Sequence, residues 1–249
     1  MKNLVLSLIL LCCCMAVEAR PSSGAAILVY HNFNPSIPGS MTLTSERVET
    51  QLQWLKTNGY TVIPLKTLVD YLMGKNDTLP QKVVALTADD GHKSVYQYLL
   101  PLAQKYHVPV TLFIYPSAIG RPGFLTWDQL KALQQTGLFD IEGHTGWHPN
   151  FKHEKKHLSP EAYQKLVHSQ LFDSKATLEK QLGTPITLLA WPYGIYDAYL
   201  EQEAAKAGYT MAFSIDYRRA KRSEKPMAEP RYMMVAEQSM QIFAGIVLG

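Results

Sequence analysis

Short apolar runs alternate with helix-like segments along most of the chain, and this alternation is the feature that most constrains its fold. The segment over residues 45–58, for example, places Val48, Leu52 and Leu55 on one helical face. Strands separated by helices of this length pair in parallel, because each helix carries the chain back across the sheet. The pattern therefore predicts an α/β fold with a mostly parallel sheet. The runs that we interpret as strands cover residues 26–30, 60–64, 83–87, 108–115, 139–143, 186–190 and 209–215.

The number of these runs favours a barrel over an open sheet. The chain has 249 residues and an apolar content of 47%, which is sufficient for one full hydrophobic core. We therefore expect a single-domain α/β barrel with surface loops at residues 75–81 and 218–229. Besides 45–58, the segments expected to form helices are 96–106, 127–135, 159–182 and 197–207.

The first residues are organised like a secretory signal peptide. Lys2 precedes an apolar run over residues 4–16, and Ala19 ends a plausible cleavage site. The run is shorter than the about 20 apolar residues of a membrane span. We therefore expect residues 1–19 to be removed, no stable membrane span to remain, and the protein to be secreted or periplasmic. An uncleaved signal or a lipid anchor is the alternative.

Composition limits the partners. The 24 basic and 21 acidic residues give a net charge of +3, and so small a surplus gives no indication of nucleic-acid binding. All three cysteines, Cys12, Cys13 and Cys14, lie in the predicted signal peptide. The mature chain would therefore have no thiol for a disulfide or a thiolate metal site.

Polar residues follow four of the predicted strands directly. His31, the pair Asp89 and Asp90, His144, and the turn at 191–194 each come after such a run. Because the carboxyl ends of parallel strands form the functional face of these folds, we expect all four groups to lie on one rim.

The two adjacent aspartates raise an electrostatic problem. Like charges at one strand end repel unless a cation lies beside them, and a metal ion would supply that charge. Alternatively, the sequence Asp-Asp-Gly simply ends a strand and caps a helix.

His144 and His148 are spaced i, i+4, so both imidazoles can meet one ion if the segment turns helically. Alone, such a pair could be incidental. The spacing resembles that of zinc proteases, but those need Glu after the first histidine and Thr145 stands here. With Asp90, the histidines make a two-His, one-carboxylate set of the kind that binds a divalent metal.

Three motifs carry a family resemblance: TADDG at 87–91, HTGWH at 144–148 and AWPYG at 190–194. They resemble, in order, the first three motifs of the polysaccharide deacetylases of carbohydrate esterase family four. The stretches ILVYHNF, GYTVIPL and EPRYMMV are similar to the branch that deacetylates poly-β-1,6-N-acetylglucosamine. The resemblance implies a distorted (β/α)₇ barrel over residues 25–249 and metal-dependent hydrolysis of N-acetyl groups from an N-acetylglucosamine polysaccharide.

The resemblance also implies residue roles. Asp90, His144 and His148 would hold a divalent ion, zinc in most members, with nickel or cobalt as alternatives. Asp89 would be the general base that takes a proton from water. The backbone N–H of Tyr193 would stabilise the oxyanion that forms from the acetyl group.

The chain departs from the family pattern in its first and third motifs. Ala88 stands where the family usually has Phe, and Ala190 stands where many members have the arginine that orients the base. Arg231 in EPRYMMV is our candidate for that role; the alternative is a solvated loop arginine.

The histidine segment that supplies the general acid near the C-terminus of many members is also missing. His31 is our candidate for that acid, and the alternative is a structural histidine that hydrogen-bonds a loop.

Aromatic residues in the motifs are candidates for substrate binding. Trp147 and Trp191 could stack on sugar rings, with Pro192 beside them. Trp127 and the tail 239–249 are expected to serve packing. The remaining histidines, expected to face solvent, are His92, His107, His153, His157 and His168.

Three functions remain open from sequence. The first is deacetylation of poly-β-1,6-N-acetylglucosamine, and the second is deacetylation of peptidoglycan or chitin-type oligosaccharides. The third is a catalytically silent sugar-binding module of the same fold.

Overall fold

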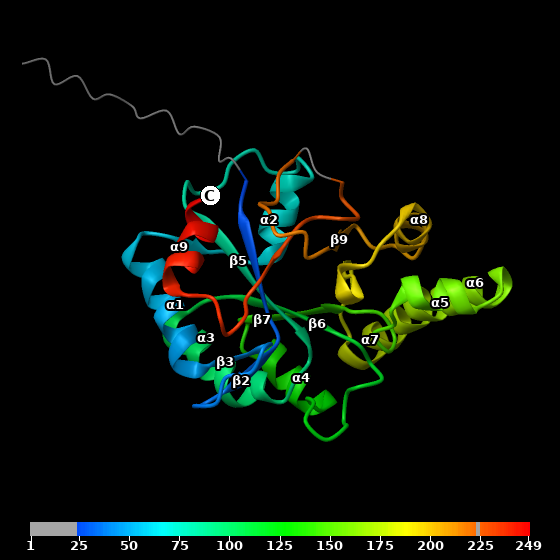
Figure 1. Ribbon diagram of the computed structural model, residues 1–249, viewed down its shortest axis with the longest axis horizontal. Coiled ribbons are helices and arrows are strands. Elements are labelled where there is room, and N and C mark those ends of the chain that lie inside the picture. The colour runs from blue at the N-terminus through cyan, green and yellow to red at the C-terminus, as the bar shows by residue number, and fades with distance from the viewer. Residues whose placement is uncertain (1–23, 223–224) are drawn as a thin grey trace, which may run out of the picture.

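A curled sheet of parallel strands forms the centre of the molecule, with helices packed around it (Figure 1). The computed structural model describes residues 24–222 and 225–249, so the predicted signal peptide lies outside the described residues. The strands of the sheet are β1 (Ala26–Tyr30), β4 (Thr61–Val62), β5 (Val83–Asp90), β6 (Val110–Ile114), β7 (Phe139–Gly143), β8 (Leu188–Ala190), β9 (Met211–Phe213) and β10 (Tyr232–Met233). They lie in the order β10-β1-β5-β6-β7-β8-β9, and β4 pairs with the start of β5.

The two ends of this strand order approach each other. Glu229 forms a parallel bridge with Phe213 of β9, and the chain then enters β10, which pairs with β1. The short segment before β10 therefore links the last strand in the order to the first, and the sheet curls into a half-barrel.

The joint between β7 and β8 depends on a side chain. The two strands pair through Gly143 and Leu189. Further down, Oε2 of the buried Glu142 accepts hydrogen bonds from the backbone N–H groups of Thr187 and Leu188, both at 2.8 Å. The carboxylate thus satisfies backbone donors that a neighbouring strand would otherwise pair.

Alternate strand residues face the two sides of the sheet. Ile27 and Ala85, which are register partners, face the inside, where they pack with helix α2 (Leu65–Leu72). Leu28 and Leu86, the next partners, face the outer helices. Helix α2 lies near the amino ends of the strands (Figure 1). It fills that end of the half-barrel and leaves the carboxyl ends for the site.

Side-chain caps define where several outer helices begin. Thr44 caps the first, Thr126 and Gln129 form a capping box on the fourth, and Asp197 caps the eighth. Within the described ranges, no helix is both long and apolar enough to cross a bilayer. The helices besides α2 are α1 (Ser45–Thr57), α3 (Leu100–Tyr106), α4 (Trp127–Gln135), α5 (Phe151–His157), α6 (Pro160–His168), α7 (Ser174–Leu182), α8 (Ala198–Lys206) and α9 (Met240–Leu248).

Every predicted strand overlaps an observed one, although β5 extends three residues beyond the predicted 83–87 and β10 was not predicted; some helices also differ from expectation. The predicted helix 159–182 consists of α6 and α7 joined by a π-helical segment, Ser169–Asp173. The predicted helix 96–106 likewise begins with the π-helical segment Val95–Leu99. Helices α2, α5 and α9 were not predicted, although the tail that contains α9 was expected to serve packing. Helix α2 has only eight residues and begins at Pro64 without a side-chain cap, so it lacks the usual start signal, whereas α5 buries only Phe151 and lacks an apolar stripe.

A small parallel sheet lies beside the first π-helical segment. Its strands, β2 (Asn32–Asn34) and β3 (Thr42–Thr44), were not predicted because each has three residues and no apolar run. Ser94 anchors this sheet by accepting a hydrogen bond from the backbone N–H of Phe33 at 3.0 Å.

Candidate active site

A cavity of about 390 Å³ lies at the carboxyl ends of the strands. The strand ends of β1, β5, β7 and β8 deliver polar groups to this one place, as the sequence predicts. Apolar side chains complete the wall, among them Met41 and Ile215 from loops and Met233 from β10, which carry no sequence signal of a site. The predicted site residues in its lining are His31, Asp89, Asp90, His144, His148, Trp191 and Tyr193.

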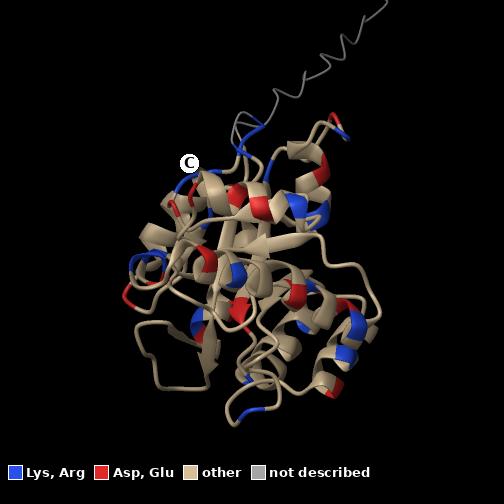
Figure 2. Ribbon diagram, turned by 90° about the vertical axis from the view of Figure 1, so that its right-hand side faces the viewer, with Lys and Arg blue, Asp and Glu red and all other residues tan. Residues whose placement is uncertain are grey.

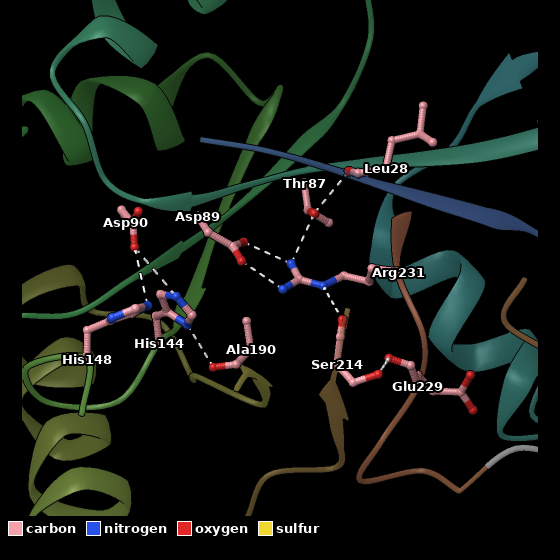
Figure 3. Close-up of polar contacts among 10 residues, drawn as sticks. All are labelled: Leu28, Thr87, Asp89, Asp90, His144, His148, Ala190, Ser214, Glu229 and Arg231. Carbon is pink, nitrogen blue, oxygen red and sulfur yellow. Dashed lines mark hydrogen bonds and ion pairs between the residues drawn. The ribbon is translucent and has the colours of Figure 1, made fainter. Parts of the chain in front are cut away.

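The two aspartates point to different partners because the backbone changes direction between them. Asp90 has a left-handed conformation with φ 74°, which Asp tolerates better than most residues, and Gly91 follows with φ 80°. A Cβ on Gly91 would lie 3.0 Å from Ile114, so glycine is needed there. Figure 3 shows the result: Asp89 faces Arg231, and Asp90 faces His144 and His148.

Asp90, His144 and His148 converge on one point. Oδ1 of Asp90 lies 3.6 Å from Nε2 of His144 and 3.7 Å from Nε2 of His148. One ligand atom from each residue lies within 4.8 Å of the others. The sequence prediction that these three residues meet therefore agrees with the structure, although the turn between the histidines is not helical. Thr145 and His148 have φ 65° and 62°.

The histidine ring atoms suit a cation. Nδ1 of His144 lies 2.7 Å from the carbonyl oxygen of Ala190, which can only accept, so Nδ1 carries the proton and Nε2 has a free lone pair. Burial, with the neighbouring His144 adding to it, lowers the pKa of His148 to about 4. His148 is therefore neutral near pH 7. Two lone pairs and a carboxylate oxygen directed at one point fit a divalent metal ion.

Gln170 holds the loop between the two histidines. Its Oε1 accepts hydrogen bonds from the backbone N–H groups of Gly146 and Trp147, at 2.9 and 3.0 Å. Gln170 lies in the π-helical segment Ser169–Asp173, and such segments often occur at functional sites. Sequence reasoning missed Gln170 because a glutamine inside a helical pattern gives no signal.

His92, expected to face solvent, instead lies beside Asp90. Its Nε2 is 3.5 Å from Oδ2 of Asp90, and its ring stacks on Phe124 with centroids 5.1 Å apart. The left-handed turn at Asp90 and Gly91 brings the His92 side chain back over the strand end. The prediction that this segment is helical gave no indication of such a turn.

Asp89 and Arg231 form a buried, two-pronged ion pair. Nη1 and Nη2 of Arg231 donate to the two carboxylate oxygens at 2.8 and 2.7 Å. Arg231 is 0% exposed, so the alternative of a solvated loop arginine is wrong. Burial would raise the pKa of Asp89, but the charge and hydrogen bonds of Arg231 outweigh it and hold that pKa below its usual value. Asp89 is therefore ionised at neutral pH.

Arg231 itself is fixed by further contacts. It donates to Oγ1 of Thr87 and to the backbone oxygen of Ser214, both at 3.2 Å (Figure 3). Its guanidinium group lies over the ring of Phe113, 5.2 Å from the centroid. The planar fork is thereby set in one orientation toward Asp89.

His31 lies between the end of β1 and the cavity. Burial lowers its pKa below the ordinary value, against the raising effect of Asp89 and Asp90. Its Nδ1 is buried and has no hydrogen-bond partner among the described residues. The ring is therefore near the carboxylates without being tied to a loop through that atom.

The aromatic residues of the motifs do not all lie where a sugar could stack. Trp191 is 1% exposed and its Nε1 donates to the backbone oxygen of Met227 at 2.8 Å. Its ring therefore supports the cavity floor, and the expectation of an open stacking surface there is wrong. Trp147 is 46% exposed but is not among the residues lining the cavity. Pro192 is buried.

Tyr193 is the exposed aromatic residue at the cavity mouth. It is 58% exposed, has φ 57°, and its ring lies 4.5 Å from that of His148. The left-handed conformation turns the Pro-Tyr-Gly segment sharply at the cavity.

A half-barrel with a carboxylate–histidine cavity at the carboxyl ends of its strands is typical of an α/β-barrel enzyme. The model of the polysaccharide deacetylase family matches residues 76–212, more than half of the chain. The chain therefore belongs to this family, as the motifs predict, and it is a hydrolase that acts on amide bonds of polysaccharides.

Individual relatives support the assignment. The Bacillus subtilis protein YxkH is 29% identical over 93% of this chain and 78% of its own length. The poly-β-1,6-N-acetyl-D-glucosamine N-deacetylase of Staphylococcus epidermidis is 27% identical over 70% of this chain and 61% of its own. The deacetylase PplD of Streptococcus pyogenes has a similar structure, with a TM-score of 0.79 at 24% identity over 91% of this chain and 99% of that one. The predicted (β/α)₇ barrel is thereby confirmed.

Proposed function

We propose that the protein hydrolyses N-acetyl groups of poly-β-1,6-N-acetylglucosamine in a metal-dependent reaction. The observation that carries the proposal is the fixed Asp89–Arg231 pair directly beside the set Asp90, His144 and His148, in one cavity. The activity of the staphylococcal relative supports the choice of glycan.

Asp90, His144 and His148 would hold the ion, with zinc as the first candidate and nickel or cobalt as alternatives. Bound there, a divalent ion would lower the pKa of water and polarise the acetyl carbonyl. The residues fit because Nε2 of each histidine and a carboxylate oxygen of Asp90 face one point.

Asp89 is suited to accept the proton of the attacking water. Arg231 keeps the carboxylate ionised and uses one lone pair on each oxygen. A carboxylate has about four such acceptor positions, so a proton can still be taken on the cavity side. The same two contacts prevent Asp89 from rotating away, which keeps the base in place for each turnover.

Two further groups complete the proposed reaction. The backbone N–H of Tyr193 would donate to the acetyl oxygen as negative charge grows on it. His31 would deliver a proton to the leaving nitrogen, which must gain one before the amine departs. Tyr193 and His31 both line the cavity.

We further propose that residues 25–249 form the catalytic domain and that residues 1–19 direct secretion or export to the periplasm. The amino-terminal sequence of the mature protein should then begin at Arg20. A lipid or an uncleaved apolar segment at this end would instead give membrane attachment.

The proposed function is tested by measuring free amine released from a panel of glycans. The panel contains poly-β-1,6-N-acetylglucosamine, chitin oligomers and peptidoglycan, and the expected preference is the first. Asp89→Asn should retain metal and lose about 10²–10⁴-fold in turnover, whereas Asp90→Asn should lose metal. Amine release from another glycan only would reassign the substrate, and release from none would indicate a silent binding module.

A further inference from the structure

A second cavity of about 370 Å³ lies among α5, α6 and α8. These helices group together on one side of the molecule (Figure 1). We call this cavity the lysine pocket. The lining residues that define it are Lys152, Lys155, Lys156, Tyr163, Tyr196 and Asp197. A neighbouring hollow of about 290 Å³ shares Lys155 and Tyr163 with it, so the depression continues along α6.

The lysine pocket adjoins the active site along two segments of chain. His148 lines the active-site cavity, and Phe151, three residues later, lines the lysine pocket. Gly194 lines the first and Ile195 the second. The rings of Phe151 and Trp191 are in edge contact between them, 6.3 Å apart. The two cavities therefore lie next to each other, with these two buried rings between them.

The charge of the lysine pocket is positive. Its lining has three lysines and one carboxylate, that of Asp197. Nζ of Lys155 lies 2.6 Å from Oδ2 of Asp197, so these two charges form an ion pair. Lys152 and Lys156, both exposed on α5, remain as the excess charge. On this side of the molecule, which faces the viewer in Figure 2, basic and acidic residues are otherwise interspersed.

The wall of the lysine pocket also carries an unsatisfied hydroxyl group. Tyr163 is 5% exposed, and its OH has no hydrogen-bond partner among the described residues. A buried hydroxyl without a partner costs free energy. Nζ of Lys155 lies over the same ring, 5.8 Å from its centroid. A tyrosine hydroxyl and lysine ammonium groups together are donors for the oxygens of an anion.

We propose that the lysine pocket binds an acidic substituent, a carboxylate or a phosphate, on a sugar close to the N-acetylglucosamine that is deacetylated. This inference rests on the proposed function and adds that chains of this glycan which carry such acidic groups are the preferred substrates. Lysine is a point charge that suits either anion. Amines created by deacetylation are repelled by the same lysines, so the pocket would favour glycan not yet deacetylated.

A kinetic experiment tests the proposal on the full protein. The substrates are three N-acetylglucosamine oligomers of equal length: one neutral, one with a carboxylate and one with a phosphate on the neighbouring sugar. The variant is the double substitution Lys152→Ala and Lys156→Ala. Its matched control is Lys131→Ala with Lys180→Ala, two exposed lysines of α4 and α7 that do not line the lysine pocket.

The wild-type protein should process an acidic oligomer with a kcat/KM about tenfold above that of the neutral oligomer, the value expected for two partly exposed ion pairs. The pocket variant should lose this preference through KM alone, with kcat and the neutral oligomer unchanged. The control should keep it. The substituent of the oligomer with the higher kcat/KM identifies the anion that the lysine pocket binds. Equal kcat/KM values in the wild type, or a preference that survives in the pocket variant, would overturn the proposal.

A binding experiment separates this inference from the proposed function. Calorimetry on Asp89→Asn protein, with and without the two lysine substitutions, measures affinity without turnover. Lysine-dependent binding of the acidic oligomer, with no hydrolysis by wild type, would refute the proposed function and retain the pocket. Hydrolysis without lysine-dependent binding would refute the pocket alone.

Tyr163→Phe extends the same test to the hydroxyl group. It should bind the acidic oligomer about three- to tenfold more weakly, as expected for one hydrogen bond. Its thermal midpoint should not fall, because the hydroxyl has no partner to lose in the free protein. Unchanged affinity would remove Tyr163 from the pocket.

Discussion

Arg231 binds both carboxylate oxygens of Asp89, at 2.8 and 2.7 Å, although the two residues are 142 positions apart in the chain. The motif position at which the family usually carries its base-orienting arginine is Ala190 here, and Ala190 is fully buried. The arginine that contacts the proposed base thus comes from the position directly before β10 and not from the third motif.

Removing this arginine should be costly. In Arg231→Met, the buried Asp89 loses its countercharge, and breaking such a pair costs about 3–5 kcal/mol of unfolding free energy. Burial then raises the pKa of Asp89, so the acid limb of the pH–rate profile should move to higher pH. Chemical denaturation and kcat/KM at several pH values measure both effects.

Arg231→Lys is the matched control, since it keeps the charge and loses the fork. It should recover much of the stability and little of the activity. If Arg231→Met kept the pH profile and rate of the wild type, Arg231 would have no part in orienting Asp89.

Metal binding should depend on His148. His148→Ala removes one of two imidazole ligands, so elemental analysis should find most of the bound metal gone and deacetylation lost. His153→Ala, whose side chain is 60% exposed outside the cavity, should keep both. Activity should also disappear with a chelator and return with added zinc, nickel or cobalt. Full metal occupancy in His148→Ala would contradict the assignment of this ligand.

Local patterns were sufficient to predict where the site lies. Strand β5 is a continuous apolar run that ends in Asp89 and Asp90, and β7 ends directly before His144, so parallel pairing alone brings them together. The turn geometry was not predictable, because left-handed conformations at Asp90 and His148 depend on contacts with other segments.

Long-range contacts account for what sequence could not establish. Arg231 was a candidate by similarity, but its burial follows from the pairing of β10 with β1, two elements at opposite ends of the chain. Helix α2 was missed, although its apolar face is present in the sequence, because its eight residues begin at Pro64 without a side-chain cap. The buried Trp191 shows the same limit, since a motif does not reveal which face of a ring is covered.

Stability should decrease as pH rises through the range in which Glu142 titrates. Burial raises the pKa of Glu142 from 4.5 to about 7, against the lowering effect of Lys66. Between these values the folded state holds a proton that the unfolded state has released, so the free energy of unfolding falls by at most about 1.4 kcal/mol per pH unit. Denaturation curves at pH 5, 6, 7 and 8 measure this slope.

Glu142→Gln should flatten that slope, because Gln does not titrate and can still accept from the backbone N–H groups of Thr187 and Leu188. Asp140→Asn is the control: Asp140 pairs with the same Lys66 but is 38% exposed, so the slope should remain. Parallel curves for wild type and Glu142→Gln would show that Glu142 does not control the pH dependence.

His31 is the residue whose proposed role depends most on experiment. It lines the cavity beside Asp89 and Asp90, and its buried Nδ1 has no partner in the described part of the chain. If it protonates the leaving amine, His31→Ala should keep the metal, keep the thermal midpoint within a few degrees, and lower kcat far more than it raises KM. The basic limb of the pH–rate profile should change as well, because that limb reports the essential acid. His107→Ala, in the turn after α3, is the control and should behave as wild type. Normal turnover in His31→Ala, or activity lost only through unfolding, would remove His31 from the mechanism and leave the proton to water or another group.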